Sequence, residues 1–159
     1  MPTEIERKFL LADDSWRESA HASARFRQGY LSTSGRSAIR VRVSPEKSRL
    51  TIKSSDSGMV RAEYEYDVPR AHAEEMLDTL CIGSIIEKTR HLIKHGRHTW
   101  EVDVFEGDNN GLILAEVELE DSDEVIEHPN WLGREVTGDV RYYNAYLAEH
   151  PYCQWPKNV

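Results

Sequence analysis

The chain has 159 residues, enough for one domain with a buried core, and its 20 Lys and Arg against 28 Asp and Glu give a net charge of -8. This balance argues against nucleic-acid binding over a broad basic surface, and 30% charged residues without an apolar run of spanning length argue against a membrane protein. Cys81 and Cys153 lie far apart with no Cys or His at zinc-site spacing, so neither a disulfide framework nor a structural zinc is predicted.

The first predicted element is a strand at residues 3–9, within the segment TEIERKFL. Successive side chains of a strand point to opposite faces, so Glu4, Glu6 and Lys8 share one face and the apolar residues share the other. Arg7 falls on the apolar side, where the sequence offers no account of it beyond a partly exposed outer surface. No apolar signal segment precedes this strand, and we therefore expect a cytoplasmic protein.

Further strands are predicted almost end to end along the chain, separated by turn-rich stretches. Five segments alternate as cleanly as the first, and two more have a strand-like composition with mixed faces. The total is eight strands, which indicates a β-rich α+β domain with hairpin connections. In chain order the further strands are 25–31 (mixed), 39–43, 50–53, 61–68, 85–93 (mixed), 100–104 and 113–120.

Helical patterns are fewer. Residues 13–19 predict a short helix, and residues 69–81 begin with a Pro suited to a first helical turn and carry an apolar stripe. Residues 122–128 have a Ser cap and stop at Pro129, and residues 139–150 have an Asp cap. No internal repeat or linker divides the chain, so all 159 residues are predicted to form one domain.

Charged residues occupy one face of strand after strand. An open antiparallel sheet with its charged face in water explains any single strand of this kind. That explanation is less satisfactory for six strands, because a solvent-exposed face usually contains Thr, Ser, Gln and Lys rather than runs of Glu and Arg. An open sheet would also leave two unpaired edges. The alternative is a closed eight-stranded antiparallel β-barrel, with a charged lumen and with helices packed outside.

Two pairs of carboxylates lie on the same face of a strand, about 7 Å apart along it. They are Glu4 with Glu6, and Glu116 with Glu118. A hard divalent cation that prefers oxygen ligands, typically Mg2+ or Mn2+, relieves such repulsion. The pattern therefore predicts a metal site, although pairing with lumen bases is the simpler explanation for each residue taken alone.

Two pairs of bases show the opposite charge in the same arrangement. They are Arg40 with Arg42, and Lys88 with Arg90. Clustered Arg and Lys donors suit phosphate oxygens. Carboxylates that bind a metal ion, next to basic residues that bind phosphate, are typical of a phosphoryl-transfer site.

The segment EIERK at 4–8 matches the ExExK signature of the CYTH superfamily, the triphosphate tunnel metalloenzymes. ExExK alone is a weak signal, but the sequence resembles this family over nearly its whole length, with further motifs in the family's order. These are RQGYL at 27–31, IRVR at 39–42, LTIKS at 50–54, RAEYEY at 61–66, EKTR at 87–90, EVDVF at 101–105, AEVELE at 115–120 and EVTGDVRYYN at 135–144. The resemblance implies a closed eight-stranded tunnel, a divalent metal and a linear triphosphate substrate.

The resemblance also implies roles for the residues at matching positions. The implied metal ligands are Glu4, Glu6, Glu116 and Glu118. The implied triphosphate-binding residues are Lys8, Arg40, Arg42, Lys53, Arg61, Lys88, Arg90 and, from the final helix, Arg141. The implied catalytic residues are Lys8, Lys88, Glu63 and Asp103. Glu63, Glu65 and Asp103 are lumen acids whose task is metal contact, water positioning or pairing with bases, and the sequence does not divide these roles.

Compact length and RQGYL resemble the bacterial inorganic tripolyphosphatase branch, so we expect hydrolysis of tripolyphosphate to pyrophosphate and phosphate with Mg2+ or Mn2+. Thiamine triphosphatase and class IV-like adenylyl cyclase are the enzymatic alternatives, and a non-catalytic polyphosphate- or nucleotide-binding module is the other. A substrate with a ring is disfavoured because four candidate contacts fall on the outer face, namely Tyr64, Tyr66, Val102 and Val104. No nucleic-acid or membrane partner is expected. A homodimer stays open, since sequence does not locate exposed apolar patches.

Overall fold

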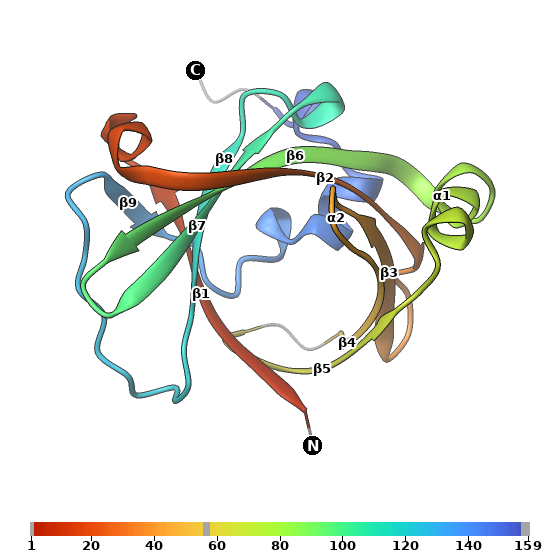
Figure 1. Cartoon of the computed structure of the whole chain (residues 1–159), viewed down its shortest axis with the longest axis horizontal. Coiled ribbons are helices and arrows are strands. Elements are labelled where there is room, and N and C mark those ends of the chain that lie inside the picture. Colours follow the sequence, from red (N-terminus) through yellow and green to blue (C-terminus); the bar gives the residue numbers. More distant parts are fainter. Residues whose placement is uncertain (1, 56–57, 157–159) are drawn as a thin grey trace.

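The computed structural model describes residues 2–55 and 58–156, and its main feature is one antiparallel sheet closed into a ring (Figure 1). The strands follow the order β5-β4-β3-β2-β6-β7-β8-β1, and β1 also pairs with β5. The predicted eight-stranded antiparallel barrel is thereby confirmed. The strands of the ring are β1 (Thr3–Leu11), β2 (Ala20–Ser32), β3 (Ser37–Val43), β4 (Ser48–Ser54), β5 (Val60–Asp67), β6 (Ile82–His95), β7 (His98–Phe105) and β8 (Ile113–Glu118).

The ring closes at β1, because this strand pairs with both of the segments that would otherwise be open edges. Glu4 lies opposite Arg61 of β5, and Lys8 lies opposite Glu116 of β8. A ninth strand, β9 (Leu132–Glu135), which the sequence did not predict, pairs with the end of β1. This arrangement brings the N-terminal charges beside the acids of β8, although more than 100 residues separate them in sequence.

The apolar outer face of β1, β7 and β8 is covered mainly by aromatic side chains. Phe9 and Trp100 meet edge to face with ring centroids 5.6 Å apart, and Trp100 meets Trp131 in the same way at 5.7 Å. Trp16 is fully buried in the same cluster. Such pairs add about 0.5–1.5 kcal/mol each beyond the area that they bury. This cluster packs against the two strands that carry all four predicted metal ligands, β1 and β8.

Two α-helices pack against the ring. The predicted helix at 69–81 is α1 (Arg70–Thr79), which lies outside the ring and buries Ala73 and Leu77 against Val41 and Val43 of β3 (Figure 1). The second, α2 (Asn144–Glu149), lies within the outline of the ring in Figure 1. It buries Leu147 in a cluster with side chains of β6 and β7.

The predicted helix at 139–150 is two pieces. A 3-10 turn, η3 (Val140–Tyr142), precedes α2, and between them Tyr143 has extended backbone angles (φ -77°, ψ 138°). The carbonyl oxygen of Tyr142 accepts a hydrogen bond from Lys8 Nζ at 3.0 Å instead of from a helical N–H. The other 3-10 turns are η1 (Ser15–Ser19) within the predicted helix at 13–19, η2 (Gly107–Asn109) and η4 (Tyr152–Gln154).

The predicted helix at 122–128 is wrong, because the segment forms turns and irregular backbone. Its acidic side chains bond to nearby backbone instead. Glu124 accepts from the N–H of Glu120, and Asp121 accepts from the N–H of Asp123. These local bonds compete with the helical pattern. Across residues 2–55 and 58–156, no helix is long and apolar enough to cross a membrane.

Candidate active site

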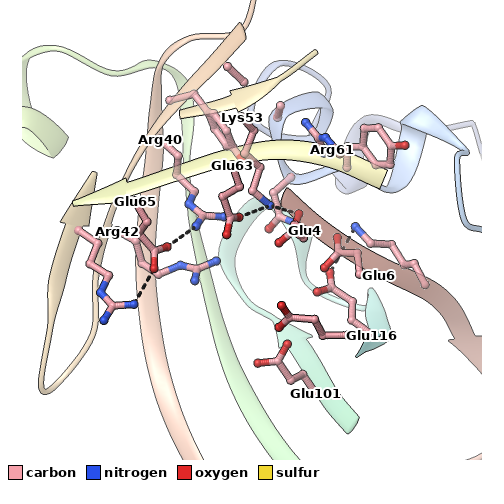
Figure 2. A pocket seen from close by; sticks show the side chains of 18 of the residues that line it. Glu4, Glu6, Arg40, Arg42, Lys53, Arg61, Glu63, Glu65, Glu101 and Glu116 are labelled. Atoms are coloured by element: carbon pink, nitrogen blue, oxygen red, sulfur yellow. Dashed lines mark hydrogen bonds and ion pairs between the residues drawn. The ribbon is translucent and has the colours of Figure 1, made fainter. Parts of the chain in front are cut away.

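The interior of the ring holds a cavity of about 270 Å³ with an almost wholly charged wall (Figure 2). Eight cationic and seven acidic side chains line it, so most charges have an opposite charge within reach. All of the predicted site residues except Asp103 and Arg141 face this space. The lining consists of Glu4, Glu6, Lys8, Tyr30, Ala38, Arg40, Arg42, Arg49, Lys53, Arg61, Glu63, Glu65, Lys88, Arg90, Glu101, Glu116, Glu118, Tyr143, Asn144 and Ala145.

Alternation along the strands is what aims these side chains inward. Glu4, Glu6 and Lys8 come from β1, and Glu116 and Glu118 come from the neighbouring β8. Antiparallel pairing sets Glu6 opposite Glu118 and Lys8 opposite Glu116. The four predicted metal ligands therefore occupy one part of the wall, as the sequence predicted. Figure 2 shows Glu6 and Glu116 across the cavity from Arg40 and Arg42.

The carboxylates of this part of the wall differ in how well their charge is compensated. Burial opposes ionisation of Glu116, but Lys8 at 3.3 Å and Arg90 at 3.7 Å outweigh it and lower its pKa to about 2. Burial, together with repulsion from Glu116 and Glu4, raises the pKa of Glu6 to about 8. Among the described residues, Glu6 therefore lacks the close cationic partners that Glu116 has.

Uncompensated acids of this kind fit a divalent cation, because a hard metal ion supplies the positive charge that Glu6 lacks and accepts carboxylate oxygens as ligands. Glu118 behaves similarly, since burial and repulsion from Glu4 raise its pKa. Within the described residues, no group of three or more His, Cys, Asp or Glu side chains is arranged so that it could hold a metal ion. Glu4, for example, is turned to Lys53, whose Nζ lies 2.9 Å from its Oε1.

The opposite charge is concentrated around Asp103, a fully buried carboxylate behind the cavity wall. Asp103 accepts from Arg90 Nε at 2.8 Å and from Arg90 Nη2 at 2.9 Å, and Lys88 Nζ lies 2.7 Å from its Oδ2. Burial opposes its ionisation, but these cations hold the pKa of Asp103 well below its usual range. Asp103 thus fixes two predicted phosphate-binding cations from behind, without facing the cavity itself.

Crowding of cations and burial disfavour the charged forms of two of them. Burial, helped by the nearby Arg90 and Arg42, lowers the pKa of Lys88 to about 7 against the pull of Asp103. Burial, helped by Arg40 and Arg90, lowers the pKa of Arg42 to about 9. An anion in the cavity stabilises both charged forms. The electrostatics of this part of the wall therefore favour a polyanionic ligand.

The remaining predicted cations lie nearer β4 and β5. Lys53 contacts Glu63 at 3.4 Å as well as Glu4, and Arg40 Nη2 donates to Thr51 Oγ1 at 3.1 Å. Arg61 donates to the carbonyl of Ser54 and lies over the ring of Tyr143. These contacts keep the side chains extended along the wall.

Arg141 is the predicted binding residue that the structure places elsewhere. It pairs with Asp139 at 2.7 Å, its side chain is 52% exposed, and it is not part of the cavity lining. The break in the helix at Tyr143 is the reason, because it turns Tyr143 and Asn144 inward and leaves Arg141 at the surface.

Several lining residues were missed or left without a role by the sequence. Glu101 and Arg49 have the inward parity of their strands, so alternation alone could have found them. Tyr30 and Tyr143 are aromatic residues in the wall that the sequence did not single out. Lys8 and Arg61 both lie over the Tyr143 ring, so it packs against cations. Asn144 had no sequence signal, because a regular helix would not single it out.

Several known proteins resemble this chain over nearly its whole length. The family model for the CYTH domain matches residues 2–151. A curated protein from Acetivibrio thermocellus, named inorganic triphosphatase, is 44% identical over 152 residues, covering 96% of this chain and 97% of that protein. A second inorganic triphosphatase, from Nitrosomonas europaea, is 39% identical and covers 92% of this chain and 97% of that protein. A crystal structure of an inorganic triphosphatase superposes with a TM-score of 0.66 at 35% identity, covering 91% and 97% of the two chains.

Proposed function

This chain belongs to the CYTH domain family, and from that premise we propose that it hydrolyses inorganic tripolyphosphate to pyrophosphate and phosphate inside the ring. The observation that carries the proposal is the division of the cavity wall, with acids lacking compensation on β1 and β8 and crowded cations on β3 and β6. Triphosphatase activity of the two curated relatives supports the same conclusion, since each matches nearly the full length of this chain.

The cations hold the substrate. Donors come from β3 and β6, the two strands that flank β2, through Arg40, Arg42, Lys88 and Arg90. Lys53 and Arg61 extend the set toward β4 and β5. A linear triphosphate laid along them exchanges water for charge-assisted hydrogen bonds. Holding the chain of phosphates in place accounts for much of the expected rate gain, because phosphoryl transfer depends mainly on positioning and on charge neutralisation.

The metal-binding carboxylates are Glu4, Glu6, Glu116 and Glu118. When bound there, Mg2+ or Mn2+ supplies positive charge to the phosphate oxygens and to a reacting water. Glu116 is ionised at neutral pH through its contacts with Lys8 and Arg90, so it is ready to bind a cation. Glu6 gains from that cation, because burial and repulsion from Glu116 and Glu4 oppose its charged form.

The reaction joins a water oxygen to the terminal phosphorus and breaks the bond from that phosphorus to the bridging oxygen, which leaves on pyrophosphate. Lys8 of β1 and Lys88 of β6 both line the cavity and offset the negative charge that builds on the transferring group. Glu63 is the carboxylate available to accept a proton from the water, since it faces the cavity and only Lys53 pairs with it among the described residues. Asp103 keeps Lys88 and Arg90 in position.

The test measures phosphate released from tripolyphosphate, pyrophosphate, ATP and thiamine triphosphate, each with Mg2+ and with Mn2+. We expect release from tripolyphosphate above all others, and loss of at least about 100-fold in kcat/KM for Glu118→Gln, the size of a lost electrostatic contact to a transition state. Glu120→Gln is the matched control, because Glu120 lies two residues further on, beyond the end of β8, and does not line the cavity.

Two results would overturn the proposal. Absence of phosphate release under either metal, with tight tripolyphosphate binding, would indicate the non-catalytic binding module instead. Formation of cyclic AMP and pyrophosphate from ATP would indicate an adenylyl cyclase.

A further inference from the structure

A short chain of amide groups links the C-terminal segment to the phosphate-binding cations. Arg42 Nε donates to Gln28 Oε1 at 2.8 Å, and Gln28 Nε2 donates to Asn144 Oδ1 at 3.1 Å. Lys88 Nζ donates to the same Asn144 oxygen at 3.0 Å. Gln28 is fully buried on β2, whereas Asn144, the first residue of α2, is partly buried and faces the cavity.

The direction of this chain follows from the chemistry of its ends. Arg and Lys side chains only donate hydrogen bonds, so the atom facing Arg42 must be the Gln28 oxygen and the atom facing Lys88 must be the Asn144 oxygen. With its oxygen taken, Gln28 presents its NH2 group to Asn144, which again requires an acceptor there. Both ends therefore assign the same orientation to the Asn144 amide, and this assignment does not depend on telling oxygen from nitrogen by position.

The NH2 group of Asn144 takes no part in this chain of hydrogen bonds. The Asn144 NH2 carries two donors, and none of the side-chain hydrogen bonds among the described residues uses it. It is not among the buried atoms that lack a partner, which fits a group in contact with the cavity space.

We propose that Asn144 donates a hydrogen bond from its Nδ2 to a phosphoryl oxygen of the bound triphosphate, and that Gln28 is the positioning residue that keeps the donor turned inward. The inference rests on the proposed function and adds to it a binding residue from the C-terminal segment.

A neutral donor suits this position for a physical reason. Arg42, Lys88 and Arg90 already repel one another in a buried space, and a fourth cation would add to that repulsion. An amide supplies a hydrogen bond to phosphate without adding charge. Its acceptor oxygen also draws on two donors, one of them cationic, which polarises the amide and strengthens the donor on its other side.

The decisive variant is Asn144→Asp. Its carboxylate still accepts from Lys88 and from Gln28, so a merely structural role of Asn144 is preserved, but the two donors are lost. Ala145→Asp is the matched control, because it adds the same charge at the next cavity-lining position without removing a donor. Thermal unfolding of each variant shows whether it is folded.

The measurement is titration calorimetry of tripolyphosphate into each protein in EDTA, so it does not depend on turnover. We expect Asn144→Asp to bind at least about 10-fold more weakly than Ala145→Asp, as a lost hydrogen bond to a charged group predicts. Equal affinities of these two variants would overturn the inference while leaving the proposed function intact. Failure of the parent protein to bind tripolyphosphate would instead overturn the proposed function, and the inference with it.

A second variant tests the positioning role of Gln28 through the kinetic constants KM and kcat. Gln28→Met keeps the side-chain volume but removes one of the two donors that orient the Asn144 amide, leaving Lys88 as the other. We therefore expect KM for tripolyphosphate to rise about 2- to 10-fold while kcat changes less than about 2-fold. A fall in kcat with unchanged KM would contradict a positioning role in substrate binding.

Discussion

The guanidinium of Arg7 donates two hydrogen bonds to the carboxylate of Glu135, from Nε to Oε2 at 2.9 Å and from Nη2 to Oε1 at 2.7 Å. Arg7 points away from the lumen, and its partner stands on β9, the strand that adds to the end of β1. The contact explains a charge on the apolar side of β1, because its partner lies 128 residues away in sequence. It also ties the added strand to the ring.

Stability should depend on this pair in a pH-dependent way. The hydrogen bond from Arg7 is the main cause that lowers the pKa of Glu135, so the contribution is present above the unfolded pKa of a Glu and is lost as pH falls through the lower folded value. We expect Glu135→Gln to lower the free energy of unfolding by about 0.5–1 kcal/mol at pH 7, a value limited by exposure to solvent.

Urea unfolding of parent and variant between pH 7 and pH 3 checks this prediction. The two curves should approach each other toward the acid end, as Glu135 of the parent takes up its proton. Glu18→Gln, a change at an exposed carboxylate of η1, serves as the control. A difference that persists undiminished at pH 3 would contradict the prediction.

Metal removal should reveal the repulsion among the lumen acids. Adding Mg2+ or Mn2+ to metal-free protein is expected to raise the melting temperature, because a ligand that binds the folded state alone stabilises it. Glu6→Gln should raise the melting temperature in EDTA, since it removes a carboxyl whose ionisation is opposed by burial and by repulsion from Glu116 and Glu4, and should reduce the rise on adding metal. Glu120→Gln should respond as the parent does. An equal metal-induced rise in Glu6→Gln would exclude Glu6 as a ligand.

Tripolyphosphate affinity should depend on the charge of Lys88. Burial lowers the pKa of this lysine to about 7, and phosphate prefers the protonated form, so affinity should fall as pH rises above that value. Lys88→Arg keeps its charge at all of these pH values and should weaken less over pH 6 to 9. Calorimetry on both proteins cancels the titration of tripolyphosphate itself. Parallel pH profiles would show that Lys88 stays charged throughout.

The packing of α2 should be worth a core contact. Leu147 is fully buried beside Ile86 and Phe105, so we expect Leu147→Ala to lower the free energy of unfolding by about 2–5 kcal/mol. Leu80→Ala, at a 58% exposed position after α1, should cost less than about 0.5 kcal/mol. Urea unfolding measures both, and similar losses in the two variants would show that α2 is not anchored through Leu147.

Much of the ring could be predicted because the alternation of charged and apolar residues along a strand shows which side chains face the lumen. In β1, the period of two separates Glu4, Glu6 and Lys8 from Phe9 without reference to any other strand. The same rule places inward nearly every residue that the family resemblance implies as a ligand. Side chains whose direction follows from the strand period are therefore accessible to sequence reasoning.

What escaped prediction depends on partners that are distant in sequence. The helix at 139–150 is broken at Tyr143, where the Tyr142 carbonyl accepts a hydrogen bond from Lys8, with Arg141 at the surface and Asn144 facing the cavity. β9 is only four residues long and forms against the end of β1. The predicted helix at 122–128 does not form, and local hydrogen bonds between acidic side chains and backbone N–H groups are present there instead. Periodicity contains none of this information.

The closure of the ring at β1 has a consequence for biosynthesis. β1 pairs with residues 60–62, 115–118 and 132–135, so its partners are made after it. At 5–20 residues per second, β1 waits on the order of ten seconds before β8 exists. The acids of its inward face thus meet those of β8 only near the end of translation, and pairings this distant in sequence place the chain among slow folders.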